Sequence, residues 1–191
     1  MSFSRLNAYN IKSSLWATVT LIFLGLISVS VITYAKSSTK NTTQQTISAD
    51  VTIDKVFVNK SERVLKLLSG DKVIKTYHIA LGDSPAGHKR QEGDERTPTG
   101  TYNLDYKNEN SKYYRSIHIS YPNASDKAQA KKRGVSPGGD IMIHGQRNGL
   151  GHLAVITQQR DWTDGCIAVT DNEMDEIMSV YKAGMPIEIV E

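Results

Sequence analysis

The sequence is nearly without cysteine, and its first quarter is without acidic residues. Cys166 is the only cysteine among 191 residues, so no internal disulfide can form and the lone thiol requires another explanation. No aspartate or glutamate precedes Asp50, and the chain contains no internal repeat. A chain of this length has room for one domain with a hydrophobic core and one further segment.

The net charge of +3 comes from the region that lacks acidic residues. Four of the 23 basic residues precede Asp50, so 19 basic and 20 acidic residues lie from that position onward. This part of the chain therefore has a net charge of −1. We expect no nucleic-acid partner, because nucleic acids are bound through clusters of positive charge.

An uncharged, largely apolar segment occupies residues 13–35. As a helix, its 23 residues would extend roughly 34 Å at ~1.5 Å per residue, enough to cross the hydrocarbon core of a bilayer. Trp16 and Tyr34 lie near its ends, where interfacial aromatic residues are expected. We predict a membrane anchor, preceded by a cytoplasmic segment at 1–12. The alternative is a cleaved signal peptide with a small-x-small site at Thr33–Ala35. Both interpretations predict export of the remaining chain.

Residues 36–50 are polar and without apolar periodicity, which is typical of a flexible linker. Residues 51–191 are predicted to form one mainly β domain, because short runs rich in β-branched residues alternate with turn signals. The polar stretch 82–98 is predicted to be a long surface loop. We expect strands at 51–58, 63–68, 73–81, 101–104, 116–120, 141–144 and 186–190.

One amphipathic helix is predicted near the C-terminus. Thr170 and Glu173 have the spacing of a capping box, and Gly184 is predicted to end the helix. A second, polar helix is predicted on the surface at 123–133, where alanines favour helix formation. The apolar face of the C-terminal helix is predicted from the i, i+3, i+4, i+7 spacing of Met174, Ile177, Met178 and Tyr181.

Cys166 follows Gly165 and precedes an apolar run, so it stands at the entrance of a predicted strand. A glycine permits a strained turn or a close backbone approach, which nucleophile sites often require. A thiol needs a base to become a good nucleophile. His144, at the end of the predicted strand 141–144, is the candidate base. Pairing with His144 is predicted to lower the pKa of the thiol.

Two other interpretations of this cysteine remain open. A free cysteine is commonly a buried, unreactive residue. The other interpretation is a metal site formed by Cys166, His144, His152 and Asp164, although one cysteine without regular ligand spacing is weak support for it.

Several stretches, in the same order, resemble the L,D-transpeptidase catalytic domain family, also called YkuD-like. His144-Gly145 matches the family's His-Gly motif, and Thr163–Ile167 matches Ser/Thr-x-Gly-Cys followed by an apolar residue. Residues 92–102 resemble its Gly-Asp-x-x-Thr-Pro-x-Gly-x-Tyr segment. Further similar segments lie at 119–123 and 137–141, and the resemblance extends from about Val51 to Val190.

The resemblance implies a β-sandwich-like fold and chemistry on peptidoglycan stem peptides. By this analogy Cys166 attacks the carbonyl between the third residue and the terminal D-alanine of a stem peptide, and His144 accepts the thiol proton. Backbone N–H groups around Gly165 and Cys166 would stabilise the oxyanion. The backbone carbonyl of Gly145 would orient the imidazole. No metal and no organic cofactor is implied.

Four further residues are predicted to contact the substrate. Thr163 and Asp164 adjoin the nucleophile, and Arg147 and His152 follow the His-Gly motif. The sequence departs from the family at Ala168, because an arginine usually stands two residues after the cysteine. A guanidinium there would help to hold the substrate or the catalytic loop. Its absence resembles a divergent branch that includes members which hydrolyse rather than cross-link.

Three functions remain open from the sequence. The first is a transpeptidase that joins stem peptides after release of D-alanine. The second is a hydrolase with the same acyl-enzyme, which acts as an L,D-carboxypeptidase or releases a wall-attached protein. The third is a non-catalytic wall-binding module, against which the intact His144 and Cys166 argue. The predicted location is the cell envelope, with the domain on the outer side of the cytoplasmic membrane.

Overall fold

The computed structural model describes residues 47–48 and 50–191. The predicted anchor at 13–35, the segment 1–12 before it and most of the linker 36–50 lie outside these residues. Within the part that is described, no helix is both long enough and apolar enough to cross a membrane.

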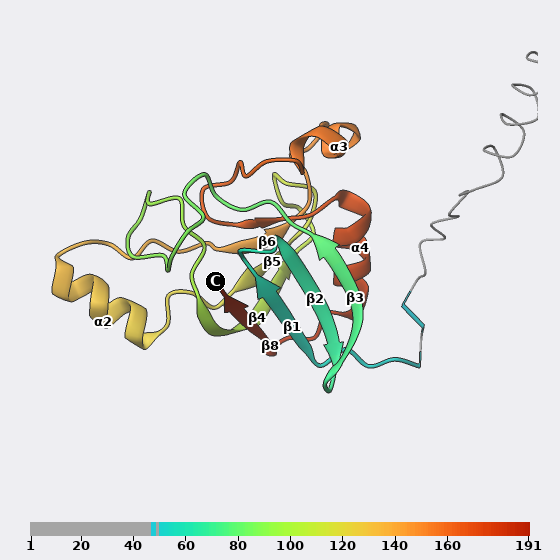
Figure 1. Cartoon of the computed structure of the whole chain (residues 1–191), viewed down its shortest axis with the longest axis horizontal. Coiled ribbons are helices and arrows are strands. Elements are labelled where there is room, and N and C mark those ends of the chain that lie inside the picture. Colours follow the sequence, from blue (N-terminus) through green and yellow to red (C-terminus); the bar gives the residue numbers. More distant parts are fainter. Residues whose placement is uncertain (1–46, 49) are drawn as a thin grey trace, which may run out of the picture. The chain divides into compact units, whose positions relative to one another are not determined.

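The described chain is built around one mixed sheet of eight strands (Figure 1). The order of the strands across the sheet is β3-β2-β1-β8-β4-β5-β6-β7. Most neighbours are antiparallel, whereas β1 with β8 and β6 with β7 are parallel. The strands are β1 (Lys55–Asn59), β2 (Val64–Ser69), β3 (Lys72–His78), β4 (Gly100–Asn108), β5 (Ser116–Ile119), β6 (Met142–His144), β7 (Ile167–Ala168) and β8 (Met185–Val190).

Burial alternates along the first two strands, as the sequence pattern predicts. In β1 the buried positions are Val56 and Val58, and in β2 they are Leu65 and Leu67. Val56 pairs with Leu67 in the antiparallel ladder. Because successive side chains point to opposite faces of a strand, this register directs one apolar row from each strand into the core.

The two ends of the sheet meet at an isolated bridge between Ala80 and Ala168. Each residue donates its N–H to the carbonyl oxygen of the other, at N···O distances of 3.0 and 2.8 Å. Ala80 follows β3, and Ala168 belongs to β7, which are the two edge strands. The sheet therefore curls until its edges approach each other. The predicted sandwich-like arrangement takes the form of one curled sheet rather than two separate ones, because the bridge joins both edges.

Helix α4 (Asp171–Val180) closes the core against the sheet. Its predicted capping box is confirmed, since the Thr170 side chain accepts from the N–H of Glu173 and the Glu173 carboxylate accepts from the N–H of Thr170. The helix ends at Val180, earlier than the predicted stop at Gly184, because Tyr181 has an extended backbone. Its buried side chains are Met174, Ile177 and Met178, as predicted.

All buried residues of the hydrophobic core lie between Ile53 and Ile189. Residues 46–191 form one compact unit. This domain contains its whole core, so it is expected to fold without the residues that precede it.

Two more helices project from the domain at different places (Figure 1). α2 (Ala124–Arg133) confirms the predicted surface helix and stands at the left of the view. α3 (Ala154–Thr157) follows a 3-10 turn, η1 (Gly151–Leu153), and stands at the top. α3 is not expected from the sequence, because a single helical turn is too short to show a periodic pattern.

Three strand boundaries differ from the prediction by more than one residue. The first strand begins at Lys55 rather than at residue 51, and the third ends at His78. β4 extends to Asn108 because β8 pairs with its first half and β5 with its second half. The predicted loop at 82–98 contains no helix and no strand, which confirms it.

Candidate active site

A cavity of about 510 Å³ lies where the segment between β4 and β5 meets β6 and the turn before β7. Among the predicted site residues, Cys166, His144, Thr163 and Asp164 line it. The cavity therefore brings the candidate nucleophile and the candidate base to one place. Its other lining residues, mostly polar or aromatic, are Asn108, Asn110, Ser111, Lys112, Tyr113, Ser116, Asp140, Met142 and Trp162.

Cys166 stands directly before β7, and its side chain is partly exposed to the cavity. The N–H of Met142 donates to Sγ at 3.4 Å, and the thiol donates to the carbonyl oxygen of Asp140 at 3.5 Å. The backbone at the start of β6 therefore holds the sulfur. The described residues include no hydrogen bond between Cys166 and His144, although both line the cavity.

Two buried threonines hold the turn that carries the cysteine. The hydroxyl of Thr163 donates to the carbonyl oxygen of Cys166 at 2.8 Å and accepts from the N–H of Gly165 at 3.2 Å. The hydroxyl of Thr97 donates to the carbonyl oxygen of Gly165 at 2.9 Å. Thr163 therefore bonds to the backbone of Gly165 and Cys166, and Thr97 bonds to that of Gly165. These bonds hold the turn, and with it the sulfur of Cys166, in place.

Gly165 has a backbone conformation and surroundings that exclude other residues. Its φ is +117°, and an added Cβ would lie 2.6 Å from the carbonyl oxygen of Arg96. Glycine is required here because the backbones of Gly165 and Arg96 lie too close together to leave room for a Cβ atom. The predicted oxyanion role of Gly165 fits less well, because its N–H is already bonded to Thr163.

His144 ends β6 and is 4% exposed. Its Nδ1 lies 2.7 Å from the carbonyl oxygen of Gly145, which can only accept, so Nδ1 carries the proton. Nε2 is consequently the unprotonated, basic nitrogen. Gly145 is close-packed, since a Cβ there would lie 2.7 Å from Oδ1 of Asp171 and 2.9 Å from Cβ of Tyr114.

Two aromatic rings surround the imidazole of His144. The ring centroid of Tyr113 lies 4.7 Å from that of His144, and the centroid of Trp162 lies 5.6 Å from it. The two aromatic rings are themselves 5.9 Å apart. The indole N–H of Trp162 is buried and has no hydrogen-bond acceptor among the described residues. These rings exclude water from the base and limit its rotation.

Burial determines the protonation of both candidate catalytic groups. It lowers the pKa of His144 to about 4, and the bond to the Gly145 carbonyl opposes this shift. Burial also raises the pKa of the Cys166 thiol, and the N–H of Met142 opposes that shift. Both groups are therefore neutral at pH 7. The predicted lowering of the thiol pKa is wrong, because desolvation of the thiolate is the larger effect.

Arg147 and His152 do not line the cavity, and both are exposed. The last residue of this stretch that lines the cavity is His144, so the structure does not bring these two predicted substrate contacts to the site. Among residues 47–48 and 50–191, no group of three or more histidine, cysteine, aspartate or glutamate side chains is arranged to hold a metal ion.

Two buried glutamines support the strand that follows the nucleophile. Nε2 of Gln158 donates to the carbonyl oxygen of Ala168 at 3.0 Å, and Nε2 of Gln146 donates to that of Val169 at 2.7 Å. The two side chains are 8% and 1% exposed. Ala168 itself is fully buried. The amides therefore hold this strand by its backbone, at the position where the family resemblance leads one to expect an arginine.

Thr97, Tyr113, Gln146, Trp162 and Gln158 have no predicted role in the site. Two of them carry a signal in the sequence, because Trp162 directly precedes the cysteine motif and Thr97 lies in the family-like segment 92–102. The other three come from separate segments and meet the candidate catalytic pair through the curl of the sheet. No local pattern distinguishes these three from ordinary surface residues.

The chain is similar in sequence to proteins of one family. The sequence model for the L,D-transpeptidase catalytic domain (YkuD) matches residues 53–189. A relative named "Putative L,D-transpeptidase YafK", from Escherichia coli (strain K12), is 30% identical over 162 residues, or 81% of this chain and 56% of the relative.

Two solved structures are also similar. The helical cell shape determining protein Pgp2 from Campylobacter jejuni is 26% identical with a TM-score of 0.55, over 74% of this chain and 49% of that one. Bd1075 from Bdellovibrio bacteriovorus is 20% identical with a TM-score of 0.50, over 76% of this chain and 50% of that one, and shows a shared fold alone. The chain thus spans about half the length of the proteins it matches.

Proposed function

This chain belongs to the L,D-transpeptidase catalytic domain family, and on that premise we propose that it is a cysteine acyl-transferase of the cell envelope. The proposed substrate is a peptidoglycan stem tetrapeptide, and the proposed leaving group is its terminal D-alanine. Cys166 is the nucleophile and His144 the general base. Thr163 and Thr97 position the turn that carries the nucleophile.

The tautomer of His144 supports its role as base. Nδ1–H is bonded to the Gly145 carbonyl, so the lone pair of Nε2 can accept a proton. The thiol turns from the Asp140 carbonyl toward Nε2 and gives up its proton while Sγ bonds to the substrate carbonyl carbon. Because both groups start neutral, proton transfer accompanies the attack rather than preceding it.

The next step breaks the bond to D-alanine. The N–H of Cys166 is the proposed oxyanion donor, since the N–H of Gly165 is bonded to Thr163. When the tetrahedral intermediate collapses, the proton on His144 passes to the departing amine and a thioester remains on Cys166. An acceptor amine then attacks the thioester, a new amide forms, and the sulfur recovers its proton through His144.

One observation carries this proposal: Cys166 and a backbone-oriented, neutral His144 line the same cavity. Neither a buried, unreactive cysteine nor a wall-binding module requires this arrangement. Neither alternative explains why the thiol and the imidazole line the same cavity.

A second candidate is hydrolysis of the same thioester by water. It is favoured by Ala168, which is fully buried and bridged to Ala80. The arginine that this family usually places two residues after the cysteine is absent here, and with it a guanidinium that would help to hold the substrate or the catalytic loop. A hydrolase would release either D-alanine or a protein attached to the stem peptide.

The test uses the domain from Thr46 onward, incubated with a disaccharide-tetrapeptide and a second stem peptide as acceptor. Intact-mass spectrometry follows the protein, and a parallel analysis follows the peptides. We expect an adduct on Cys166 and cross-linked dimers. Tripeptide without dimers would instead favour the hydrolase.

The Cys166→Ala variant is the control and is expected to fold, form no adduct and give no product. A wild-type domain that forms neither adduct nor product, while remaining folded by circular dichroism, would contradict the proposed acyl-enzyme. Product formation by Cys166→Ala would contradict the role of the cysteine.

A further inference from the structure

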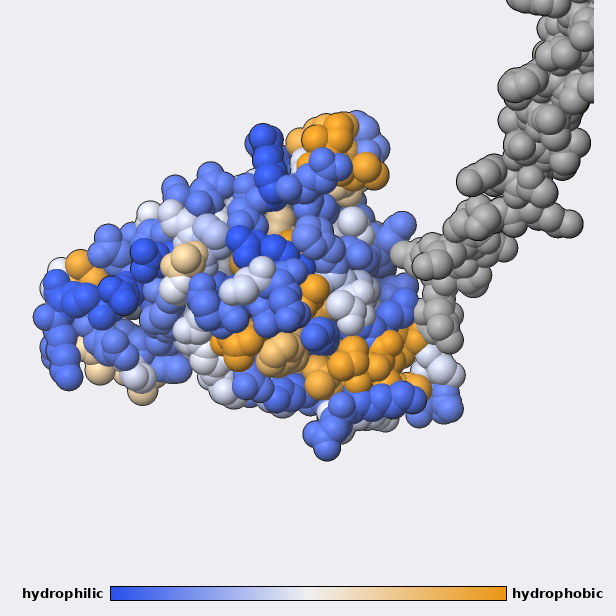
Figure 2. Space-filling view, viewed as in Figure 1, coloured by the Kyte–Doolittle hydropathy of each residue, from blue (hydrophilic) through white to orange (hydrophobic). Residues whose placement is uncertain are grey.

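The segment between the catalytic histidine and cysteine exposes large apolar side chains. Val155 is 79% exposed and Ile156 is 64% exposed, and Leu150 and Leu153 are also exposed. The described chain has only two other exposed large apolar residues, Val73 and Tyr106, and both lie on strands. We name the segment Leu150–Ile156 the α3 protrusion. Figure 2 shows its apolar side chains gathered at the top of the domain.

The α3 protrusion is held to the domain in a defined orientation. Within the protrusion the side chain of Ala154 is buried, and two residues after its end Nε2 of Gln158 donates to the carbonyl oxygen of Ala168. At its other end, the N–H of Asn148 donates to the carbonyl oxygen of Lys112 at 3.1 Å. The apolar side chains therefore point outward from a fixed base, and their exposure is not the result of an unanchored loop.

The segment that carries the protrusion is basic. No acidic residue occurs between Asp140 and Asp161, although the half-buried carboxylate of Asp171 lies against Gly151. In the same interval Arg147, His152 and Arg160 are exposed. An apolar tip with a cationic border is the pattern of a surface that enters the headgroup region of an anionic membrane.

We propose that the α3 protrusion inserts into the surface of an anionic lipid bilayer. Val155 and Ile156 would enter the boundary between headgroups and acyl chains, and the two arginines would contact lipid phosphates. A protein partner fits less well, because four side chains on a convex turn offer far less than the roughly 800 Å² per partner of a stable interface. A bilayer requires no matching groove.

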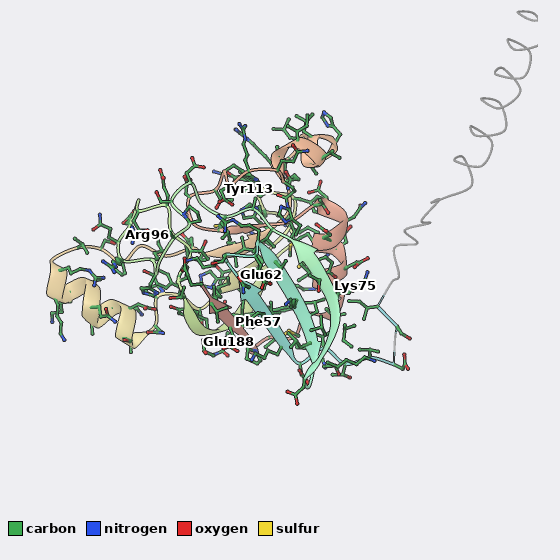
Figure 3. All side chains as sticks on the ribbon, in the orientation of Figure 1. Phe57, Glu62, Lys75, Arg96, Tyr113 and Glu188 are labelled. Carbon is green, nitrogen blue, oxygen red and sulfur yellow. The ribbon has the colours of Figure 1, made fainter. Side chains whose placement is uncertain are left out.

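This contact would bring the catalytic cavity close to the membrane. Nδ2 of Asn148 donates to the carbonyl oxygen of Ser111, and Ser111 and Lys112 line the cavity. Tyr113, in the same wall, is labelled in Figure 3 on the side of the domain where α3 projects.

The test is co-sedimentation of the domain from Thr46 onward with vesicles of phosphatidylcholine alone or mixed equally with phosphatidylglycerol. We expect binding to the anionic vesicles and little to the neutral ones. The double variant Val155→Ser with Ile156→Ser is expected to bind at least about tenfold more weakly. Arg147→Gln with Arg160→Gln is expected to weaken binding to anionic vesicles and to reduce its salt dependence.

Two matched controls separate this surface from general adhesion. Val73→Ser removes an exposed apolar side chain from β3, and Lys131→Gln with Lys132→Gln removes positive charge from α2. Both variants are expected to bind as the wild type does.

The proposal would be overturned if the folded wild-type domain did not bind vesicles or if the Val155/Ile156 variant bound them as the wild type does. It would also be overturned if either control variant lost as much vesicle binding as the Val155/Ile156 variant. Dimerisation that depends on Ile156, without vesicle binding, would assign the surface to a second copy instead. Circular dichroism of each variant confirms that the fold is intact.

Discussion

Two consecutive stretches of the chain, 141–146 and 147–160, place similar residues in opposite environments. Ile141 and Ile143 in the first stretch are 2% and 0% exposed, whereas Val155 and Ile156 in the second are 79% and 64% exposed. The first stretch contains a strand with a partner on each side, β5 and β7. The second has no sheet partner and is held through the side chains of glutamine and asparagine. β-Branched residues therefore do not by themselves decide burial.

The same contrast separates two kinds of function. The buried stretch holds His144, the candidate base, by a hydrogen bond and aromatic contacts that leave little freedom. The exposed stretch holds its apolar side chains away from the domain, where they contribute little to folding. We expect changes at buried positions of the first to affect activity and stability, and changes at the exposed apolar side chains of the second to affect only surface binding.

The largest effect is expected at the base. His144→Ala should slow formation of the Cys166 adduct by about 10² to 10⁴-fold, the range typical for loss of a general base. Reactions quenched at a series of times and analysed by intact-mass spectrometry would measure the rate of adduct formation. Arg147→Ala, a change in the exposed stretch just beyond the cavity, is the matched control and should leave the rate nearly unchanged. Equal rates for His144→Ala and the wild type would remove His144 from the mechanism.

The difference in burial between the two stretches can be tested by replacing one isoleucine in each stretch with alanine. Ile143→Ala is expected to lower the free energy of unfolding by about 2–5 kcal/mol, because it leaves a cavity in the core. Ile156→Ala is expected to change it by less than about 0.5 kcal/mol, since the side chain is already in solvent. Urea denaturation followed by circular dichroism measures both. Similar losses for the two variants would show that the protrusion is packed rather than exposed.

Burial of His144 also predicts a pH dependence of stability. Its pKa is about 4 in the folded protein and about 6.5 in an unfolded chain. Between these values the unfolded state binds more protons, so the free energy of unfolding falls as the pH falls from about 6.5 to about 4. The expected loss is about 3 kcal/mol.

Urea denaturation at a series of pH values would measure this loss in the wild type and in His144→Gln. The variant has no imidazole at this position, so its stability should fall less across the same window. A parallel decline in both proteins would mean that other groups cause the acid sensitivity.

The smallest of these effects is expected at Gln158, whose buried amide holds the end of the exposed stretch to β7. Gln158→Ala removes the amide that bonds to the Ala168 carbonyl and should cost about 1–3 kcal/mol of stability. Gln159→Ala alters the exposed neighbour and should cost less than about 0.5 kcal/mol. Thermal unfolding compares the two. If both variants have the wild-type Tm, the buried amide does not hold the exposed stretch to the sheet.

Much of the local structure could be predicted from the sequence. The alternating runs that become β1 and β2, the capping box of Thr170 and Glu173, and the glycine before Cys166 are short-range patterns. Each depends on neighbouring residues in the chain, so each can be read without knowledge of the fold. The pairing of Cys166 with His144 in one cavity also agrees with the sequence, although the resemblance to a family contributed to that prediction.

The rest depended on contacts between distant segments. The sheet order and the Ala80–Ala168 bridge decide which candidate residues share the cavity, and they leave Arg147 and His152 outside it. Burial raises the pKa of the Cys166 thiol, although a thiol–imidazole pair considered in isolation predicts a lowered pKa.

Short-range patterns of residues decide which segments form strands and helices. Which side chains become covered depends on the fold, because the covering strands and loops lie far away in the chain. The apolar residues of β6 are covered by such segments, and those of the α3 protrusion are not. Desolvation and exposure are properties of this packing, so the protonation of the catalytic pair and the outward direction of Val155 and Ile156 follow from it.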